Sequence, residues 1–366
     1  MVATLQQRSE AAKKEIASLN ARIEKSLRSK RDGSLAATFH RPLAPVRTPP
    51  SQVKCRRLLK GHFGKITALD WSADGTTIVS ASQDGNLLLW DALLTSKKQD
   101  VRLKSPYVMS VCMEKSGRYV AAGGLDNACS IYTVGDPGPA KLKTELVSHE
   151  GYLADCKFFH SPSKMLTASG DATSLLWDVE KGQIIESFRE HKANLTEVQL
   201  VESDQYLSSS TDTTIKLWDV RQGGKAGSAQ TFSGHAGDVN GITVLPNTNG
   251  AFCSCSEDGT VRVWDLRAYG EVARFGQLSQ QSERDPFSDG DAGFTSISAS
   301  RSGRLVFCGH SEGSVVCYDI LSPSNGATPA YVLQNAHEEH VSCVGVSPTG
   351  EALCTGSWDF NLKLFA

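Results

Sequence analysis

Apolar and polar residues alternate in short runs over most of the chain, and Gly, Asp, Asn or Ser bounds each run. Alternation with a period of two predicts β-strands joined by tight turns. The stretch 80–91, SASQDGNLLLWD, shows a polar turn, an apolar run and a closing aromatic residue. In seven such stretches an acidic residue precedes the aromatic by six positions: Asp84/Trp90, Asp126/Tyr132, Asp171/Trp177, Asp212/Trp218, Asp258/Trp264, Glu312/Tyr318 and Asp359/Phe365.

The closing aromatics recur at intervals of 41 to 54 residues. A repeat of this length with four short strands is typical of one WD-repeat blade. A single blade buries little apolar surface, so the repeats must pack on one another and close into a ring. We therefore predict an all-β fold, a seven-bladed WD-repeat β-propeller over residues 53–366.

The seventh repeat has only Ala366 after its closing Phe365, so its outer strand must come from elsewhere. The stretch 54–59 precedes Gly61 and His62 in the way that outer strands precede the Gly-His pair of other repeats. We expect residues 53–60 to complete the last blade, because an open strand edge would invite aggregation.

The first 30 residues follow a different, helical pattern. Between Leu5 and Leu27 there is no Gly or Pro. Apolar residues follow alternating steps of three and four, which predicts the seam of an N-terminal coiled-coil helix over residues 1–30. So short a seam is not stable alone in water, and its partner is either a helix of another chain or this chain itself, as a self-associating coil or against its own propeller. The seam residues are Leu5, Ala12, Ile16, Leu19 and Ile23. Residues 31–52 are predicted to be an extended, Pro-rich connector.

A histidine stands 21 to 23 residues before the turn Asp in five repeats, and a hydroxyl residue stands four before it. Histidine, hydroxyl and Asp are the groups of a nucleophilic triad, but a triad has no reason to occur five times. We predict that the sets link the strands of each blade, together with Trp90, Trp177, Trp218 and Trp264, and we expect no catalytic residue. The sets are His62/Ser80/Asp84, His149/Thr167/Asp171, His191/Ser208/Asp212, His235/Ser254/Asp258 and His337/Thr355/Asp359.

Charge is distributed unevenly along the chain. The net formal charge is −2, but residues 1–60 carry +10 and the remainder carries −12. A basic arm on an acidic body points to anionic partners or a membrane surface. The arm lacks interleaved aromatic residues, so nucleic acid is not the expected partner.

The remaining composition restricts the cell compartment and the chemistry. Ten cysteines occur without a secretory signal or a CxxC pair, which indicates a reduced, cytosolic protein. There is no membrane-length apolar run and no lipidation motif, so membrane attachment would come through a partner. His310 and His340 lack ligand-spaced partners, and we expect neither a metal nor a cofactor.

Several stretches resemble heterotrimeric G-protein beta subunits. They are IVSASQDGNLLLWDAL (78–93), VAAGGLDNACSIY (120–132), TASGDATSLLWDVE (167–180) and CTGSWDFNLKLF (354–365), together with the N-terminal coil. The resemblance implies a non-catalytic scaffold that pairs obligately with a small prenylated gamma subunit through the coil. It also implies that one propeller face binds a GDP-loaded alpha subunit, and that the released pair engages effectors at the inner face of the plasma membrane. The alternative is a generic WD-repeat scaffold, such as a ubiquitin-ligase substrate receptor, or an RNA-associated propeller.

Carried over by position, the resemblance implies an alpha- and effector-binding set of Lys65, Tyr107, Met109, Leu125, Tyr152, Asn194, Asp238 and Trp358. The chain departs from the family pattern at Tyr107, Asn194 and Thr196, where the family has Trp, Asp and Met. The sixth repeat has also lost its Trp and its turn Asp. The polar insertion 276–291 is long enough to carry a function, and its composition indicates only that it is solvated.

Overall fold

The computed structural model describes residue 18 and residues 53–135, 138–202, 204–248, 250–276, 293–321 and 328–366. The predicted coiled-coil helix (1–30) and Pro-rich connector (31–52) lie outside the described residues, apart from Ser18, and so does the insertion 276–291 beyond Gly276.

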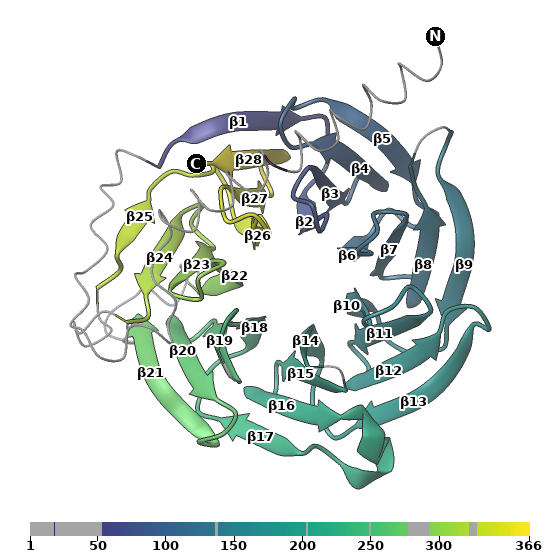
Figure 1. Cartoon of the computed structure of the whole chain (residues 1–366), viewed down its shortest axis with the longest axis vertical. Helices are drawn as coiled ribbons and strands as arrows, with labels where there is room; N and C mark the ends of the chain where they lie inside the picture. The colour runs from purple at the N-terminus through teal and green to yellow at the C-terminus, as the bar shows by residue number, and fades with distance from the viewer. Residues whose placement is uncertain are drawn as a thin grey trace, which may run out of the picture.

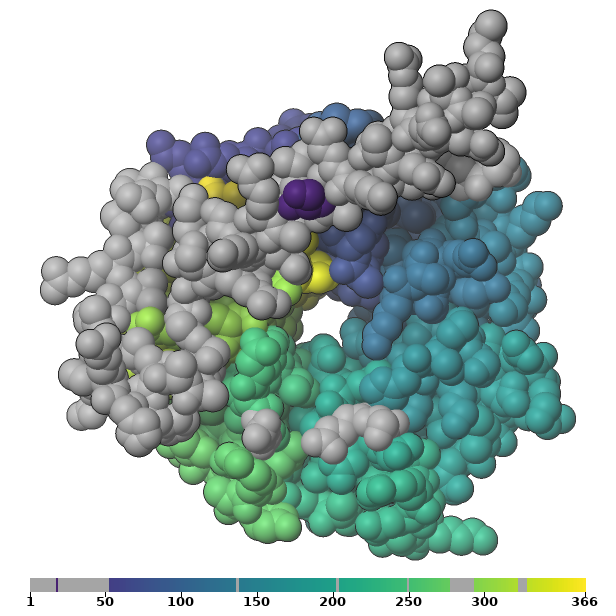
Figure 2. Space-filling view, viewed as in Figure 1, coloured from purple at the N-terminus to yellow at the C-terminus, as the bar shows by residue number. Residues whose placement is uncertain are grey.

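Seven antiparallel sheets of four strands stand around a central axis (Figure 1). The predicted all-β, seven-bladed propeller is therefore confirmed. Within each blade the four strands lie side by side, with the first strand at the central channel and the fourth at the rim. An opening remains along the axis when side chains are drawn (Figure 2). Blades one to three are β2 (Ile66–Trp71), β3 (Thr77–Ser82), β4 (Asn86–Asp91), β5 (Lys97–Arg102); β6 (Val108–Met113), β7 (Tyr119–Gly124), β8 (Ala128–Thr133), β9 (Lys141–Val147); and β10 (Leu153–Phe158), β11 (Lys164–Ser169), β12 (Thr173–Asp178), β13 (Gln183–Arg189).

The other four blades follow in chain order, and the last one takes its outer strand from the start of the propeller. Two short 3-10 turns, η1 (Val220–Gln222) and η2 (Gly224–Ala226), lie in blade four. Blades four to seven are β14 (Leu195–Glu202), β15 (Gln205–Ser210), β16 (Thr214–Asp219), β17 (Gln230–Ser233); β18 (Val239–Val244), β19 (Ala251–Ser256), β20 (Thr260–Asp265), β21 (Gly270–Gly276); β22 (Phe294–Ala299), β23 (Leu305–His310), β24 (Val315–Asp319), β25 (Tyr331–Leu333); and β26 (Val341–Val346), β27 (Leu353–Ser357), β28 (Asn361–Phe365), β1 (Cys55–Lys60).

The two ends of the propeller meet in blade seven. Strand β1 pairs with β28 in an antiparallel register that sets Leu59 opposite Leu362 and Lys60 opposite Asn361. The buried Leu59 side chain joins the core between blades seven and one. Because the first and last strands share one sheet, opening the ring requires breaking this strand pair.

The core lies between neighbouring blades. The closing tryptophans Trp90, Trp177, Trp218 and Trp264 are each no more than 2% exposed. Each apolar cluster combines side chains from adjacent blades; one contains Leu89 and Val101 of blade one with Val111 and Tyr132 of blade two. A blade thus contributes one face to each of two clusters, which is why the ring is stable only when closed.

Every inner strand has a β-bulge at its second residue, where the register with the next strand shifts. A bulge releases a residue from the ladder and redirects its side chain. In four blades this side chain donates a hydrogen bond to the first carbonyl of the next inner strand. The bonds run from Thr196 to Val239 (2.5 Å), Asn240 to Phe294 (2.9 Å), Thr295 to Val341, and Ser342 to Ile66 (2.6 Å).

At the remaining interfaces between inner strands, a side-chain oxygen accepts a hydrogen bond from a backbone N–H of the next blade. Asp70 accepts the Met113 N–H at 2.8 Å, Ser110 accepts the Cys156 N–H at 3.2 Å, and Asp155 accepts the Val198 N–H at 3.1 Å. Glu197 similarly accepts the Ile242 N–H at 2.8 Å. Consequently each of the seven interfaces has at least one hydrogen bond between inner strands.

Candidate partner-binding face

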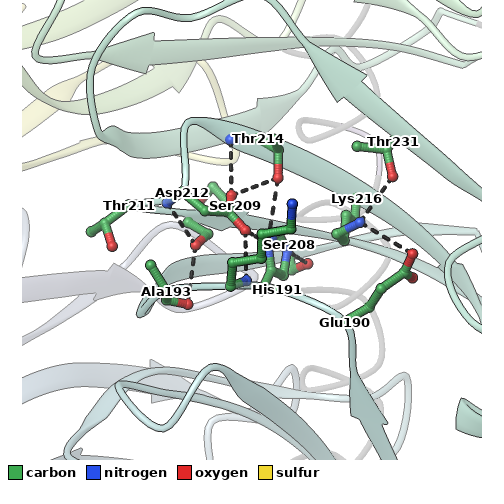
Figure 3. Close-up of polar contacts among 12 residues, drawn as sticks. Glu190, His191, Ala193, Ser208, Ser209, Thr211, Asp212, Thr214, Lys216 and Thr231 are labelled. Carbon is green, nitrogen blue, oxygen red and sulfur yellow. Dashed lines mark hydrogen bonds and ion pairs between the residues drawn. The ribbon is translucent and has the colours of Figure 1, made fainter.

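The five histidine–hydroxyl–Asp sets come together within their blades. In blade four, His191 Nδ1 lies 2.8 Å from Asp212 and its Nε2 lies 2.8 Å from the Ser208 hydroxyl, as Figure 3 shows. The other four sets have the same two contacts, at 2.7 to 3.0 Å. In each case the imidazole connects the loop before an inner strand to the turn between the second and third strands.

The hydrogen bonds form one directed chain. A carboxylate can only accept, so the histidine Nδ1 donates to Asp and its Nε2 accepts from the hydroxyl. In four blades the indole N–H of the closing Trp donates to that same hydroxyl at 2.8 to 2.9 Å. Burial alone would raise the pKa of Asp84, but the bonds from His62 and the Phe63 N–H lower it to about 2.

These sets have no access to a substrate. Ser80, Thr167, Ser208, Ser254 and Thr355 are fully buried, and their oxygens are already occupied by His or by His and Trp. A nucleophile needs a free path to its substrate as well as a base. The arrangement therefore links strands instead of activating a hydroxyl. Among the described residues, no cluster of His, Cys, Asp and Glu is suited to hold a metal ion.

Blades two and six use other contacts. Lys104 stands where blade two lacks the histidine, and its ammonium lies 2.6 Å from Glu145 on the outer strand. In blade six the buried Arg304 guanidinium pairs with Asp319 at 2.7 Å. Gly290, which stands at the histidine position of blade six, lies outside the described residues.

All eight residues that the resemblance implies for alpha-subunit and effector binding lie at one end of the blades. We call this end the candidate face; it consists of the loops before the inner strands and the turns between second and third strands. Lys65, Tyr107, Tyr152, Asn194 and Asp238 precede inner strands, and Met109 is the bulge residue of β6. Leu125 and Trp358 lie in the turns of blades two and seven.

Lys65 and Trp358 meet across the junction between blades one and seven. The Lys65 ammonium lies 3.7 Å from the centre of the Trp358 ring, a cation–π contact. The His340 imidazole stacks on the same indole, with 4.3 Å between ring centres and 22° between planes. Burial, and then the positive charge of Lys65, lower the pKa of His340. The indole is thus held between a cation and an aromatic ring.

Tyr107, Met109 and Leu125 form the apolar part of the candidate face. Their exposed fractions are 54%, 38% and 52%, which is high for such large side chains. The Leu125 N–H donates to the Tyr107 carbonyl at 3.0 Å and thereby holds the loop against the turn. This part of blade two thus presents three large apolar side chains to solvent.

Tyr152 and Asn194 meet between blades three and four. The Asn194 amide donates to the Tyr152 hydroxyl at 3.2 Å. Asp238 bonds within its own blade instead, since its carbonyl accepts the Glu257 N–H at 3.0 Å. Partial burial raises the pKa of the Asp238 carboxyl. Thr196 acts as an inter-blade donor, and its hydroxyl lies 2.8 Å from Ser209.

Sequence reasoning missed three side chains of the candidate face. The sequence shows His340 only as a histidine without ligand-spaced partners, whereas in the structure it is half-buried and stacked on Trp358. Phe63, directly after His62 of blade one, is 87% exposed, and Phe360 in the last turn is 43% exposed. An aromatic residue directly beside a turn Asp is a signal that could have identified Phe360.

Comparison with known proteins identifies the family. The model of the G protein beta WD-40 repeat protein family matches residues 5–366. A guanine nucleotide-binding protein subunit beta of Zea mays is 36% identical, with 100% of this chain and 97% of that protein covered. One of Oryza sativa subsp. japonica is also 36% identical, with 88% and 86% covered.

Solved structures support the fold alone. The structure of U3-55K has a TM-score of 0.73 at 17% identity and covers 86% of this chain and 98% of that one. The WD40 propeller domain of Doa1 has a TM-score of 0.69 at 20% identity, with 86% and 97% covered. In the part of the chain that is described, no helix is long and apolar enough to cross a membrane. The full-length match decides between the alternatives: the chain belongs to the family of G protein beta subunits, which are non-catalytic WD-repeat scaffolds.

Proposed function

We propose that the candidate face binds the GDP-loaded alpha subunit of a heterotrimeric G protein and, after release, binds effectors. One observation carries the proposal: the Lys65 cation sits over Trp358 on a face that also exposes Tyr107, Met109 and Leu125. Aromatic anchors beside a charged residue are typical of interface hot spots. Loops from several blades converge there, so a single partner would contact many of them at once.

Nucleotide dependence would reside in the alpha subunit. In switch proteins of this kind, the γ-phosphate of GTP orders the switch segments and hydrolysis releases them. A partner whose switch segments dock on the candidate face in the GDP state would leave when GTP reorders them. The beta subunit then performs no chemistry and serves as a rigid template.

The proposed second partner is a gamma subunit that pairs with the arm. The seam at Leu5, Ala12, Ile16, Leu19 and Ile23 supplies an apolar stripe that needs another helix to bury it. The basic charge of residues 1–60 would favour an anionic membrane surface nearby. A lipid on the partner would then hold the complex at the inner face of the plasma membrane while the propeller stays in the cytoplasm.

Binding of GDP-loaded alpha subunit to the purified beta–gamma pair tests the proposal. Lys65→Ala and Trp358→Ala should weaken it and leave thermal unfolding near that of the wild type. Replacing GDP by a non-hydrolysable GTP analogue should release the wild-type complex. Nucleotide-independent binding that neither variant weakens would contradict the proposed face.

A further inference from the structure

The turn between the second and third strands has the same unusual backbone in every blade. The residue after the acidic turn residue has a φ between 59° and 81° in all seven. Gly occupies this position in blades one, five and six, and Asn, Ala and Thr occupy it in blades two, three and four. In blade seven the residue is Phe360, with a φ of 68°.

Phenylalanine and the β-branched threonine of blade four are the two residues that fit this backbone poorly, and of these Thr213 is half-buried whereas Phe360 is exposed. A bulky residue rarely adopts positive φ, whereas Gly and Asn do so readily. The Phe360 side chain gains little burial in compensation, since it is 43% exposed. Backbone strain that folding does not require is commonly found at functional sites. The contacts around Phe360 therefore have to explain why it is there.

Phe360 belongs to an aromatic edge of the candidate face, in which Phe63 and Phe360 are exposed and Trp358 is half-buried. It is two residues from Trp358, which carries Lys65 and His340 on its ring. Strand β1 pairs Lys60 with Asn361, so the loop with the 87% exposed Phe63 leaves the sheet beside the Phe360 turn. We call Phe63, Trp358 and Phe360 the aromatic edge.

Charge is divided across the aromatic edge: Lys60 and Lys65 lie on its blade-one side, and acidic side chains lie on the side of blades five to seven. On the candidate face of blades five to seven, the loops and turns expose Glu257, Glu312, Glu338 and Glu339, and Asp238 is partly exposed. Among the described loop and turn residues of these three blades on this face, none is Lys or Arg. Glu338 is tied to the Phe360 turn, because its N–H donates to Asp359 at 3.3 Å. Such a surface favours a partner segment of positive charge.

We propose that Phe360 is a specificity-determining residue of the candidate face. It contacts an apolar side chain of the docking protein, and the carboxylates beside it select a segment in which Lys or Arg flanks that side chain. The inference rests on the proposed function of the face, and it adds a contact that the carried-over set does not contain. The strained turn is retained because the partner needs the ring.

Replacing Phe360 by the residues that the other blades use separates binding from folding. Phe360→Asn and Phe360→Gly remove the strain of a bulky residue at positive φ, so we expect the melting temperature of the full-length beta–gamma pair to stay level or rise. Binding of GDP-loaded alpha subunit should weaken by about tenfold or more, as for a hot-spot residue. Phe360→Tyr keeps the ring and should bind like the wild type. Thr213→Asn changes the same turn position in blade four and is the matched control, with wild-type binding expected.

Charge is tested with the double variant Glu338→Gln and Glu339→Gln. It should slow association with the alpha subunit at low salt and lose that difference at high salt. If Phe360→Asn binds within twofold of the wild type while Trp358→Ala binds weakly, the inference is wrong and the proposed face stands. If both variants bind like the wild type, the proposed face itself is wrong. A lower melting temperature for both Phe360→Asn and Phe360→Gly would show that the ring serves folding, and would also overturn the inference.

Discussion

The Lys65 ammonium lies 3.7 Å from the centre of the Trp358 ring and joins the first blade to the seventh. His340 stacks on the same indole, so Trp358 is fixed before any partner arrives. A side chain that is already ordered loses little conformational entropy on binding. Ring closure and the proposed partner binding would thus use neighbouring residues, because β1 leads directly into the loop that carries Lys65.

The histidine sets should contribute to stability and to nothing catalytic. His235→Ala removes the donor to Asp258 and the acceptor for Ser254, and each loss of a buried partner costs roughly 1–3 kcal/mol. We expect a lower denaturant midpoint for His235→Ala and for Asp258→Ala. Lys104→Ala, which removes an exposed ion pair in a blade without the set, is the control and should leave the denaturant midpoint nearly unchanged. Wild-type stability of both blade-five variants would contradict this role.

Acid should unfold the propeller through the turn aspartates. Against the effect of burial, hydrogen bonds from His62 and His337 lower the pKa of Asp84 and of Asp359 to about 2, from an ordinary value of 3.8. A depressed folded-state pKa gives stability that is present above pH 3.8 and is lost as pH falls toward 2. Thermal unfolding between pH 5 and pH 2 should show this decline. Asp84→Asn should be less stable than the wild type at pH 5 and should lose less stability than the wild type between pH 5 and pH 2. If the stability of the two proteins fell in parallel over that interval, Asp84 would not be the source of the acid sensitivity.

Glu197 should make stability fall as pH rises toward neutrality. Burial, followed by the nearby Asp155 charge, raises its pKa to about 7 from an ordinary value of 4.5, although Lys157 and the Ile242 N–H oppose the shift. A raised folded-state pKa for an acid means that stability is lost between pH 4.5 and 7. Glu197→Gln should flatten the pH dependence in that range and be relatively more stable at pH 8. An unchanged slope would show that Glu197 stays ionised.

The arm should bind its partner through the predicted seam. Ile16→Asp with Leu19→Asp places two charges where association would have to bury them, at a large energetic cost. We expect the double variant to lose a co-expressed gamma subunit in a pull-down assay. Ala11→Asp with Ala17→Asp adds the same charge outside the seam and should retain it. Equal retention by both variants, or binding that survives deletion of residues 1–30, would rule out the coiled coil.

The repeat pattern contained most of the fold and the contacts within each blade. The spacing of His235, Ser254 and Asp258 recurs in five repeats and predicts a set within each of those five blades, because each contact lies within a single repeat. Contacts between blades were not predictable in this way. Asp70 meets Met113 and Glu197 meets Ile242 only when adjacent blades pack together, and the sole sequence signal is a carboxylate inside an apolar strand.

On the candidate face, too, the contacts between blades could not be predicted from the sequence. Positions such as Lys65 and Trp358 could be carried over one at a time, but their mutual contact depends on the junction of blades one and seven. Thr196 is instructive because it stands where the family has Met. The bulge at this position turns its hydroxyl to the Val239 carbonyl, so Thr196 contributes a hydrogen bond to the junction between blades four and five.

The most direct test of the account is the affinity of GDP-loaded alpha subunit for the purified beta–gamma pair, measured with the melting temperature of each variant. Trp358→Ala and Lys65→Ala should each weaken binding, and Trp358→Ala should do so by about 2 kcal/mol or more. Ile185→Ala, an exposed apolar residue on the outer strand β13, is the matched control and should bind normally. The account predicts weak binding with unchanged melting and unchanged gamma association for the two face variants. Wild-type affinity in both, or a loss that appears only together with unfolding, would contradict it.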